Sequence, residues 1–166
     1  MSDEQSLIRV FVEALKESVE ESLKGPGISS RLVKMDLDPS LMHGEISVAS
    51  TLSLISSSYV GTINLFFPKT TFLKYYEVLL GEVPTEITSE VADASSELLN
   101  ILYGLTKKKV NERGGDFAPS LPSSFLGTNL SIISSSHKSL FFHFESDVGK
   151  FFVVLSVTRA EGQRVA

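Results

Sequence analysis

The spacing of apolar positions predicts helices in the first two thirds of the chain, separated by strand-like runs. From residue 7 to 24, apolar residues recur every three to four positions with Glu and Lys between them, which is typical of an amphipathic helix. The Gly-Pro-Gly at 25–27 ends this helix. The pattern that follows predicts strands at 31–38, 44–56 and 59–68, a helix at 69–81, and the longest helix at about 87–110.

The last third predicts strands. Residues 111–124 are rich in Gly and Pro and are predicted to form a loop, and strands are expected at 128–136, 139–147 and 150–158. The stretch FFHFESDVGKFFVVLSV within the last two is unusually apolar. It favours a buried pair of core strands, and the alternative is an edge that pairs with a second copy of the chain.

One internal similarity suggests a duplicated architecture. The segment LSLISSSYVGTINLFF (52–67) parallels LSIISSSHKSLFFHFE (130–145) at a shift of 78 residues, and helical patterns precede strand-like runs in both halves. We therefore predict an α+β fold: a pseudo-duplicated domain with an antiparallel β-sheet and two long helices packed on one face. This single domain is expected to cover residues 1–160, with 161–166 as a flexible tail.

The long helix carries two stripes when its residues are placed 100° apart. A stripe roughly 80° wide is apolar and predicts a core-facing side; within it, burial is expected for Val91, Leu98, Ile101 and Leu105, with Ile87 and Ala94 on the same side. A second stripe, roughly 60° wide, flanks the first. We call it the polar stripe, and its members are Asp93, Glu97, Asn100 and Gly104.

Glu97 and Asn100 form an E-x-x-N pair that projects from neighbouring positions of this helix. Of the four asparagines in the chain, only Asn100 has a Glu three residues earlier. Its carboxamide has no useful pKa near neutrality, but it both donates and accepts hydrogen bonds and so is suited to holding a water molecule. An ionised Glu97 would pair with a cation on a partner, and Gly104 would let a partner backbone approach. A solvated polar stripe is the simpler alternative.

Composition narrows the function classes. The chain has no Cys, which excludes disulfides and thiol nucleophiles, and its net charge of −5 argues against a nucleic-acid partner. The only basic cluster, TKKKV at 106–110, fits a lysine-rich helix C-terminus that complements the helix dipole. No stretch approaches the roughly 20 apolar residues of a membrane span, and no signal peptide is evident. We expect a cytoplasmic protein without a membrane association.

The residues described so far resemble the CheC/CheX/FliY family of phosphatases acting on phosphorylated CheY. The resemblance is carried by LIRVFVEALKESVEESL, by SSELLNILYGLTKKKV with its Glu97, Asn100 and Gly104, and by the following FAPSLPSSFLG (117–127). Family members of the CheC type carry the motif in both halves, whereas those of the CheX type carry one. The first helix offers only Glu13 before Lys16 and Glu17 before Glu20, so the resemblance is to the CheX type.

This resemblance implies a phosphatase that acts on the aspartyl phosphate of a CheY-like response regulator and so terminates a chemotaxis signal. Asn100 would position the hydrolytic water, and Glu97 would pair with the receiver's active-site lysine. Asp93 and Gly104 would complete the partner-binding surface. The chain itself would bind no cofactor or metal, because the required Mg²⁺ belongs to the partner receiver domain. CheX-type members tend to form homodimers, and we expect one here.

Two other functions remain as alternatives. The first is a non-catalytic binding module that docks a receiver domain or a flagellar-switch protein. The second is a metal hydrolase, which His43, His137 and His143 do not favour because they lack ligand spacing; His143 is expected on the outer face of a strand. The serine clusters at 56–58 and 134–136 lack a nucleophile-elbow pattern and are interpreted as turns.

Overall fold

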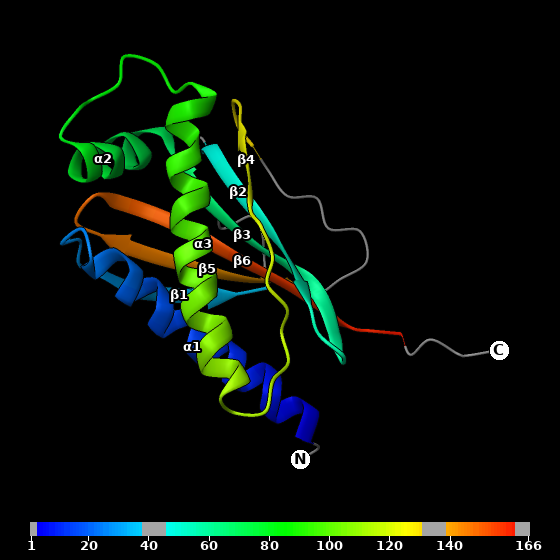
Figure 1. Ribbon diagram of the computed structural model, residues 1–166. Helices are drawn as coiled ribbons and strands as arrows, with labels where there is room; N and C mark the ends of the chain where they lie inside the picture. Colours follow the sequence, from blue (N-terminus) through cyan, green and yellow to red (C-terminus); the bar gives the residue numbers. More distant parts are fainter. Residues whose placement is uncertain (1–2, 38–45, 131–138, 162–166) are drawn as a thin grey trace.

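Three helices and six strands make up the fold in a computed structural model, which describes residues 3–37, 46–130 and 139–161 (Figure 1). In chain order the elements are α1 (Asp3–Lys24), β1 (Ser30–Asp36), β2 (Ile46–Ile55), β3 (Tyr59–Pro68), α2 (Lys69–Leu80), α3 (Ser89–Asn111), β4 (Ser123–Leu126), β5 (Ser139–Ser146) and β6 (Gly149–Arg159). The predicted tail lies outside the described residues apart from its first position.

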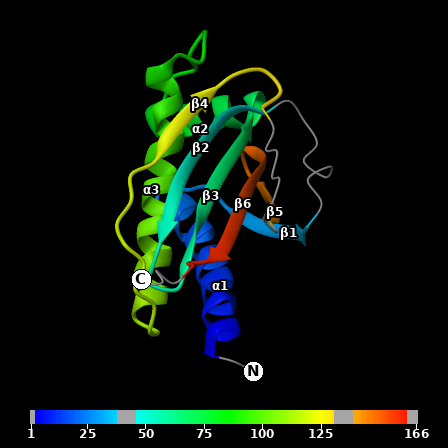
Figure 2. The same ribbon diagram turned by 90° about the vertical axis from the view of Figure 1, so that its right-hand side faces the viewer.

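All six strands belong to one antiparallel sheet with the order β1-β5-β6-β3-β2-β4. The helices cover one face of it: α3 crosses the middle of that face, α1 packs beside the C-terminal half of α3, and α2 lies beside its N-terminal half (Figure 1). In the turned view of Figure 2, α3 lies along the left side of the sheet, on its helix-covered face. The predicted α+β class, with long helices on one face of an antiparallel sheet, is confirmed.

The sheet order has a pseudo-twofold symmetry. The strand order is β1-β5-β6-β3-β2-β4. If each strand of the first half is exchanged with its counterpart in the second half (β1 with β4, β2 with β5 and β3 with β6), the same order results, read from the other edge of the sheet. Each half is a helix followed by three strands, and the first strand of each half pairs with the second strand of the other half. The predicted duplication is therefore present, with β3 and β6 paired at its centre.

The sequence similarity that suggested the duplication is out of register with it. A shift of 78 residues places β3 on β5, whereas the topology relates β3 to β6. The similarity aligns the serine runs of the two copies. The first run, at 56–58, forms the turn between β2 and β3, but the corresponding turn between β5 and β6 is at 147–148 and contains no serine. The other serine run, 134–136, lies outside the described residues.

Apolar side chains pack on both faces of the sheet. The helix-covered face holds the larger core, in which Phe142, Phe144 and Phe151 of β5 and β6 are buried. A smaller cluster on the opposite face contains Phe141 and Phe152. Because β5 and β6 are interior strands, the core interpretation of the FFHFESDVGKFFVVLSV stretch is confirmed and the edge alternative is wrong.

Two details of the second half differ from the prediction. Residues 123–126, predicted as part of a loop and its continuation, form β4, which pairs with β2 through contacts such as Val48 with Leu126. Conversely, the described part of the predicted strand 128–136 is not a strand: residues 128–129 form a bend, in which Asn129 has a φ of 52°. The remaining residues of that strand lie outside the described part of the chain. A four-residue strand with mostly exposed side chains carries too little alternation to be predicted.

Candidate functional site

The polar stripe faces away from the sheet. Asp93, Glu97, Asn100 and Gly104 are all exposed, whereas the buried residues of α3 are Val91, Ala92, Ser95, Leu98, Leu99, Leu102, Tyr103, Thr106 and Val110. On an ideal helix the centres of these two sets are roughly 150° apart. The predicted exposure of Glu97 and Asn100 is confirmed, and the two side chains lie side by side on the solvent face.

The predicted core stripe was partly wrong. Val91 and Leu98 are buried as expected, Leu105 is half-buried, and Ile101 is 50% exposed. The true buried face is rotated by roughly 90° toward Leu99 and Tyr103. This buried face includes Ser95 and Thr106, and a search for apolar spacing misses such polar residues. Ile101 is consequently left on the edge of the polar stripe.

Serine hydroxyls set the rotation of α3 over the sheet. The Ser50 hydroxyl of β2 lies 2.8 Å from the Ser95 hydroxyl and donates to the Ser95 carbonyl oxygen at 3.2 Å. Ser96 on the adjoining side hydrogen-bonds Ser124 of β4, whose hydroxyl also donates to the carbonyl of Ala92. These side chains are small enough to let the helix approach the strands closely. No sequence pattern indicates these hydrogen bonds, since their partners are distant in the chain.

The ends of α3 are also held. Thr88 caps the N-terminus, accepting a hydrogen bond from the Val91 amide at 3.3 Å. At the other end, the Asn111 side chain makes two hydrogen bonds with the backbone of Phe117, at 2.9 and 3.0 Å. Between them, the Tyr103 hydroxyl donates to the Ala118 carbonyl at 2.7 Å, and burial raises the pKa of Tyr103 to about 12. Glu97 and Asn100 therefore stand on a helix fixed at several points, which favours a preorganised site.

Gly104 has no structural role within the chain that would require glycine. A Cβ built on Gly104 meets no atom within 4 Å, and its φ is not positive. Glycine in a helix interior costs about 1 kcal/mol relative to Ala. The absence of a side chain one turn after Asn100 thus leaves a bare stretch of helix surface beside the pair.

Glu97 influences the electrostatics of the neighbouring helix. The pKa of Tyr75, a buried residue of α2, is raised by its burial and further by the negative charge of Glu97. The Tyr75 ring stacks on Phe67 of β3 at 5.6 Å and is thereby fixed over the sheet. The Glu97 side of the polar stripe therefore adjoins α2, while Ser96 adjoins β4.

The corresponding helix of the first half carries no asparagine. In α1, Glu13 is paired with Lys16 at 3.1 Å. Glu17 and Glu21 both accept hydrogen bonds from Lys109 of α3, at 3.0 and 2.6 Å, so these carboxylates join the two helices together. Lys109, predicted to serve the helix dipole, has this cross-helix role as well. That the first half lacks a second motif stays a prediction.

The described residues offer no competing metal site, since within them no three His, Asp or Glu side chains converge on one point. His143, on the outer face of β5 as predicted, packs edge-on against Phe152 with the ring centres 5.1 Å apart. Among the helices in the described ranges, none combines the length and the apolar character needed to cross a bilayer.

The architecture is that of the CheC-like proteins. A CheC-like superfamily protein from Shewanella sp. PV-4 is similar in structure, with a TM-score of 0.81 and 23% identity over 90% of this chain and 97% of that one. The chemotaxis protein CheX from Vibrio vulnificus has a TM-score of 0.80 and 21% identity, covering 89% of this chain and 99% of its own. The CheX–CheY–BeF3–Mg²⁺ complex from Borrelia burgdorferi matches with a TM-score of 0.69 and 21% identity over 93% and 97% of the two chains.

The chain belongs to the CheX family. The family described as chemotaxis phosphatase CheX matches residues 49–145, which is more than half of the chain and includes the whole of α3. No curated protein matches the chain in sequence. The resemblance seen in the sequence is therefore confirmed at the level of family and fold.

Proposed function

We propose that this protein is a phosphatase that removes the aspartyl phosphate of a CheY-like response regulator. Membership of the CheX family supports the substrate class, and a related chain crystallised with a CheY supports the kind of partner. The observation that carries the proposal is that Glu97 and Asn100 are exposed side by side on a helix held in place by the sheet.

Asn100 acts by orienting water. Its amide accepts one hydrogen bond from the water and donates another, which holds the water oxygen in line with the phosphorus. A bond forms from that oxygen to phosphorus as the bond from phosphorus to the aspartate oxygen breaks. The products are inorganic phosphate, which keeps one proton of the water, and a free aspartate carboxylate, with the other proton passing to solvent. A hundredfold acceleration requires only about 2.7 kcal/mol.

Glu97 fixes the register between the two proteins. Its carboxylate pairs with the active-site lysine of the receiver, a charge-assisted contact with defined geometry. The Mg²⁺ of the reaction is bound by the receiver, where it neutralises phosphate charge. Asp93 and Gly104 complete the docking surface along the polar stripe.

The experiment is phosphate release from a phosphorylated receiver with wild type and with Asn100→Ala. The variant keeps the docking surface but loses the water-orienting amide, so we expect receiver affinity close to wild type and dephosphorylation near the receiver's own rate. Lys108→Ala, an exposed change on the same helix two turns further on, is the control and should retain activity. Full activity of Asn100→Ala would leave the binding module as the function.

We further propose that the protein forms a homodimer, as the family resemblance implies. Exposed apolar side chains on both edge strands, Met35 of β1 and Phe125 of β4, agree with an additional interface. Light scattering at tens of micromolar should give twice the mass of the chain. A monomer would contradict the dimer and leave the catalytic proposal intact, since each chain carries a complete pair.

A further inference from the structure

The end of α2 presents a cluster of exposed apolar side chains. Val78, Leu79, Leu80 and Val83, here called the apolar cluster, are 48%, 38%, 58% and 60% exposed. On an ideal helix Val78 and Leu79 lie on the same side as the buried Phe72 and Tyr75. Their exposure shows that the last turn of α2 extends past the core that its first two turns cover.

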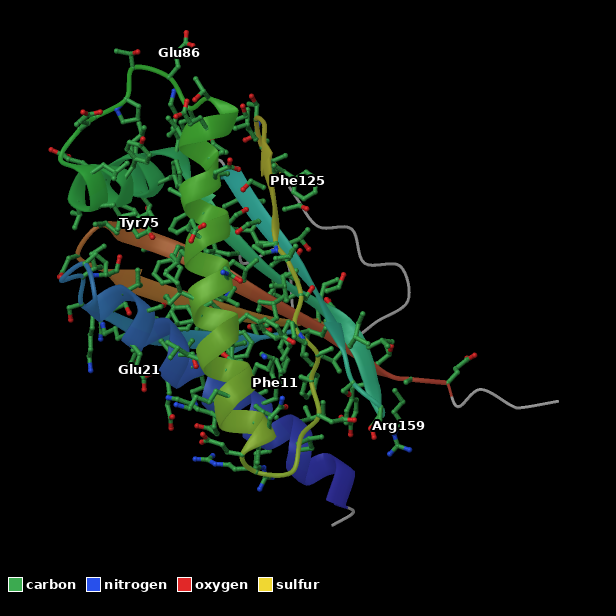
Figure 3. The ribbon with its side chains drawn as sticks, in the orientation of Figure 1. Phe11, Glu21, Tyr75, Glu86, Phe125 and Arg159 are labelled. Carbon is green, nitrogen blue, oxygen red and sulfur yellow. The ribbon has the colours of Figure 1, made fainter. Side chains whose placement is uncertain are left out.

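The backbone around this cluster is well defined. Gly81 ends α2 in the left-handed conformation, with a φ of 71°, and its amide donates to the Glu77 carbonyl at 2.8 Å. The connection from there arches above α2 and joins the N-terminal end of α3 (Figure 1). Figure 3 shows Glu86 on this connection, directed away from the sheet, and Tyr75 on the side of α2 that faces the sheet and α3.

The cluster lies within a continuous acidic segment. Between Lys74 and Lys107 the chain has no Lys, Arg or His, so residues 75–106 form what we call the acidic segment. Its six carboxylates are all exposed; they belong to Glu77, Glu82, Glu86, Glu90, Asp93 and Glu97. Its formal charge of −6 exceeds the −5 of the whole chain. Three of these carboxylates, those of Glu77, Glu82 and Glu86, lie within three residues of the apolar cluster in sequence, and the other three follow on α3 before Asn100.

We propose that the apolar cluster and its surrounding carboxylates are a second docking surface for the receiver domain, separate from the Glu97–Asn100 pair. The part of the receiver that it fits is an apolar patch bordered by Lys and Arg. The inference rests on the proposed function, because it takes the receiver as the partner that engages the other end of the same acidic segment.

Charge complementarity selects this occupant. The pair at the catalytic end is directed at a cationic side chain of the receiver, and the acidic segment continues unbroken from that end to the apolar cluster. A second copy of this chain seated on the cluster would place two acidic surfaces together, and like charges across an interface are unfavourable. A receiver with basic residues beside its phosphorylation site would meet an attractive potential along the whole segment, which also raises the association rate.

The test measures affinity and association rate with a panel of CheY-like receivers trapped with BeF3⁻ and Mg²⁺, and it measures phosphate release separately with the same receivers in their phosphorylated form. The double variant Leu80→Ser/Val83→Ser should weaken receiver binding about tenfold, because apolar anchors of an interface dominate its affinity. The rate of phosphate release at saturating receiver should remain that of wild type. Leu121→Ser, at a residue that is 87% exposed and outside the segment, is the matched control and should bind normally.

A second variant addresses the charges. Glu82→Gln/Glu86→Gln should lower the association rate several-fold at low salt, and the difference from wild type should vanish at high salt, where exposed charges are screened. Both pairs of substitutions lie at exposed positions outside the core, so circular dichroism and thermal unfolding should be unchanged.

The outcomes separate this inference from the proposed function. Unchanged receiver affinity in Leu80→Ser/Val83→Ser, with Asn100-dependent phosphate release in wild type, overturns the second docking surface alone. Binding that depends on Leu80 and Val83 without any phosphate release supports the docking surface and overturns the catalytic proposal. A change of oligomeric state in place of a change in receiver affinity assigns the cluster to self-association and overturns the inference.

Discussion

Ser50 and Ser95 face each other across the boundary between sheet and helix, with their hydroxyl oxygens 2.8 Å apart and both side chains fully buried. A buried hydroxyl without a partner is unfavourable, so this pair defines one rotation of α3 about its axis. In that rotation Glu97 and Asn100 lie on the solvent face. The exposure of the candidate site is therefore coupled to a contact on the opposite side of the helix.

The first prediction concerns this contact. Ser50→Ala should lower the free energy of unfolding by about 1–3 kcal/mol, because it leaves the buried Ser95 hydroxyl without its Ser50 partner. Ser95→Ala should cost less, because the Ser50 hydroxyl still donates to the Ser95 carbonyl oxygen. The double variant should cost less than the sum of the two, since it removes both hydroxyls. Urea unfolding of the four proteins of this cycle gives the coupling energy. Strict additivity would show that the pair does not fix the helix.

The second prediction concerns the charge of Glu97. Glu97→Lys should weaken receiver binding by at least about tenfold, because it places a like charge against the receiver's lysine. Glu97→Gln, which retains the size of the side chain, should weaken it less. Titration of the trapped receiver measures both effects. Because position 97 is exposed, both variants should stay within about 0.5 kcal/mol of wild-type stability, and equal affinities for the two would contradict the charge pairing.

The third prediction compares one substitution at two glycines. Gly104→Ala should increase stability by about 0.5–1 kcal/mol, since the new methyl group meets nothing within 4 Å and Ala favours helix. In Gly61→Ala the new Cβ would lie 1.9 Å from the Ser156 carbonyl oxygen at the centre of the sheet. This overlap forces β3 and β6 apart and should cost about 2 kcal/mol or more. Thermal unfolding of both variants tests the opposite signs.

The stabilised Gly104→Ala variant also tests the docking surface. If a receiver backbone approaches the helix at this bare position, the methyl group should reduce receiver affinity about tenfold in a protein that is more stable than wild type. Loss of binding could then not be assigned to unfolding. Wild-type affinity would show that Gly104 lies outside the contact.

The fourth prediction concerns the pairing of α1 with α3. Hydrogen bonding to Lys109, and then its positive charge, lower the pKa of Glu17 below the usual value of 4.5. Since the folded-state pKa is the lower one, this pairing stabilises the fold at neutral pH and the contribution is lost as the pH falls through the lowered pKa. Lys109→Met should therefore make the free energy of unfolding less dependent on pH between about 7 and 3. Urea unfolding at several pH values measures this dependence. Lys108→Met is the control: it leaves the ion pairs of Lys109 with Glu17 and Glu21 intact, so it should show the pH dependence of wild type.

The order and type of most elements could be predicted from sequence because their apolar spacing is regular. The helices at 7–24, 69–81 and 87–110 and the strand pair β5 and β6 were located within a few residues, since each has a well-marked apolar period and ends at Gly, Pro or a turn. The E-x-x-N pair was recognisable because i and i+3 neighbours on a helix share a face wherever that helix packs.

The spacing of Glu97 and Asn100 on one helix face could be read from the sequence, whereas the direction in which the helix turns that face depends on its tertiary contacts. Leu98, Leu99, Leu102 and Ile101 are all apolar, and their spacing allows several core faces; the buried Ser50–Ser95 pair selects the one that exposes Ile101. The partner strand β4 and the bridges from Lys109 to α1 connect residues far apart in the chain. Such contacts depend on where the chain brings distant residues together, and periodicity within a single segment carries no information about that.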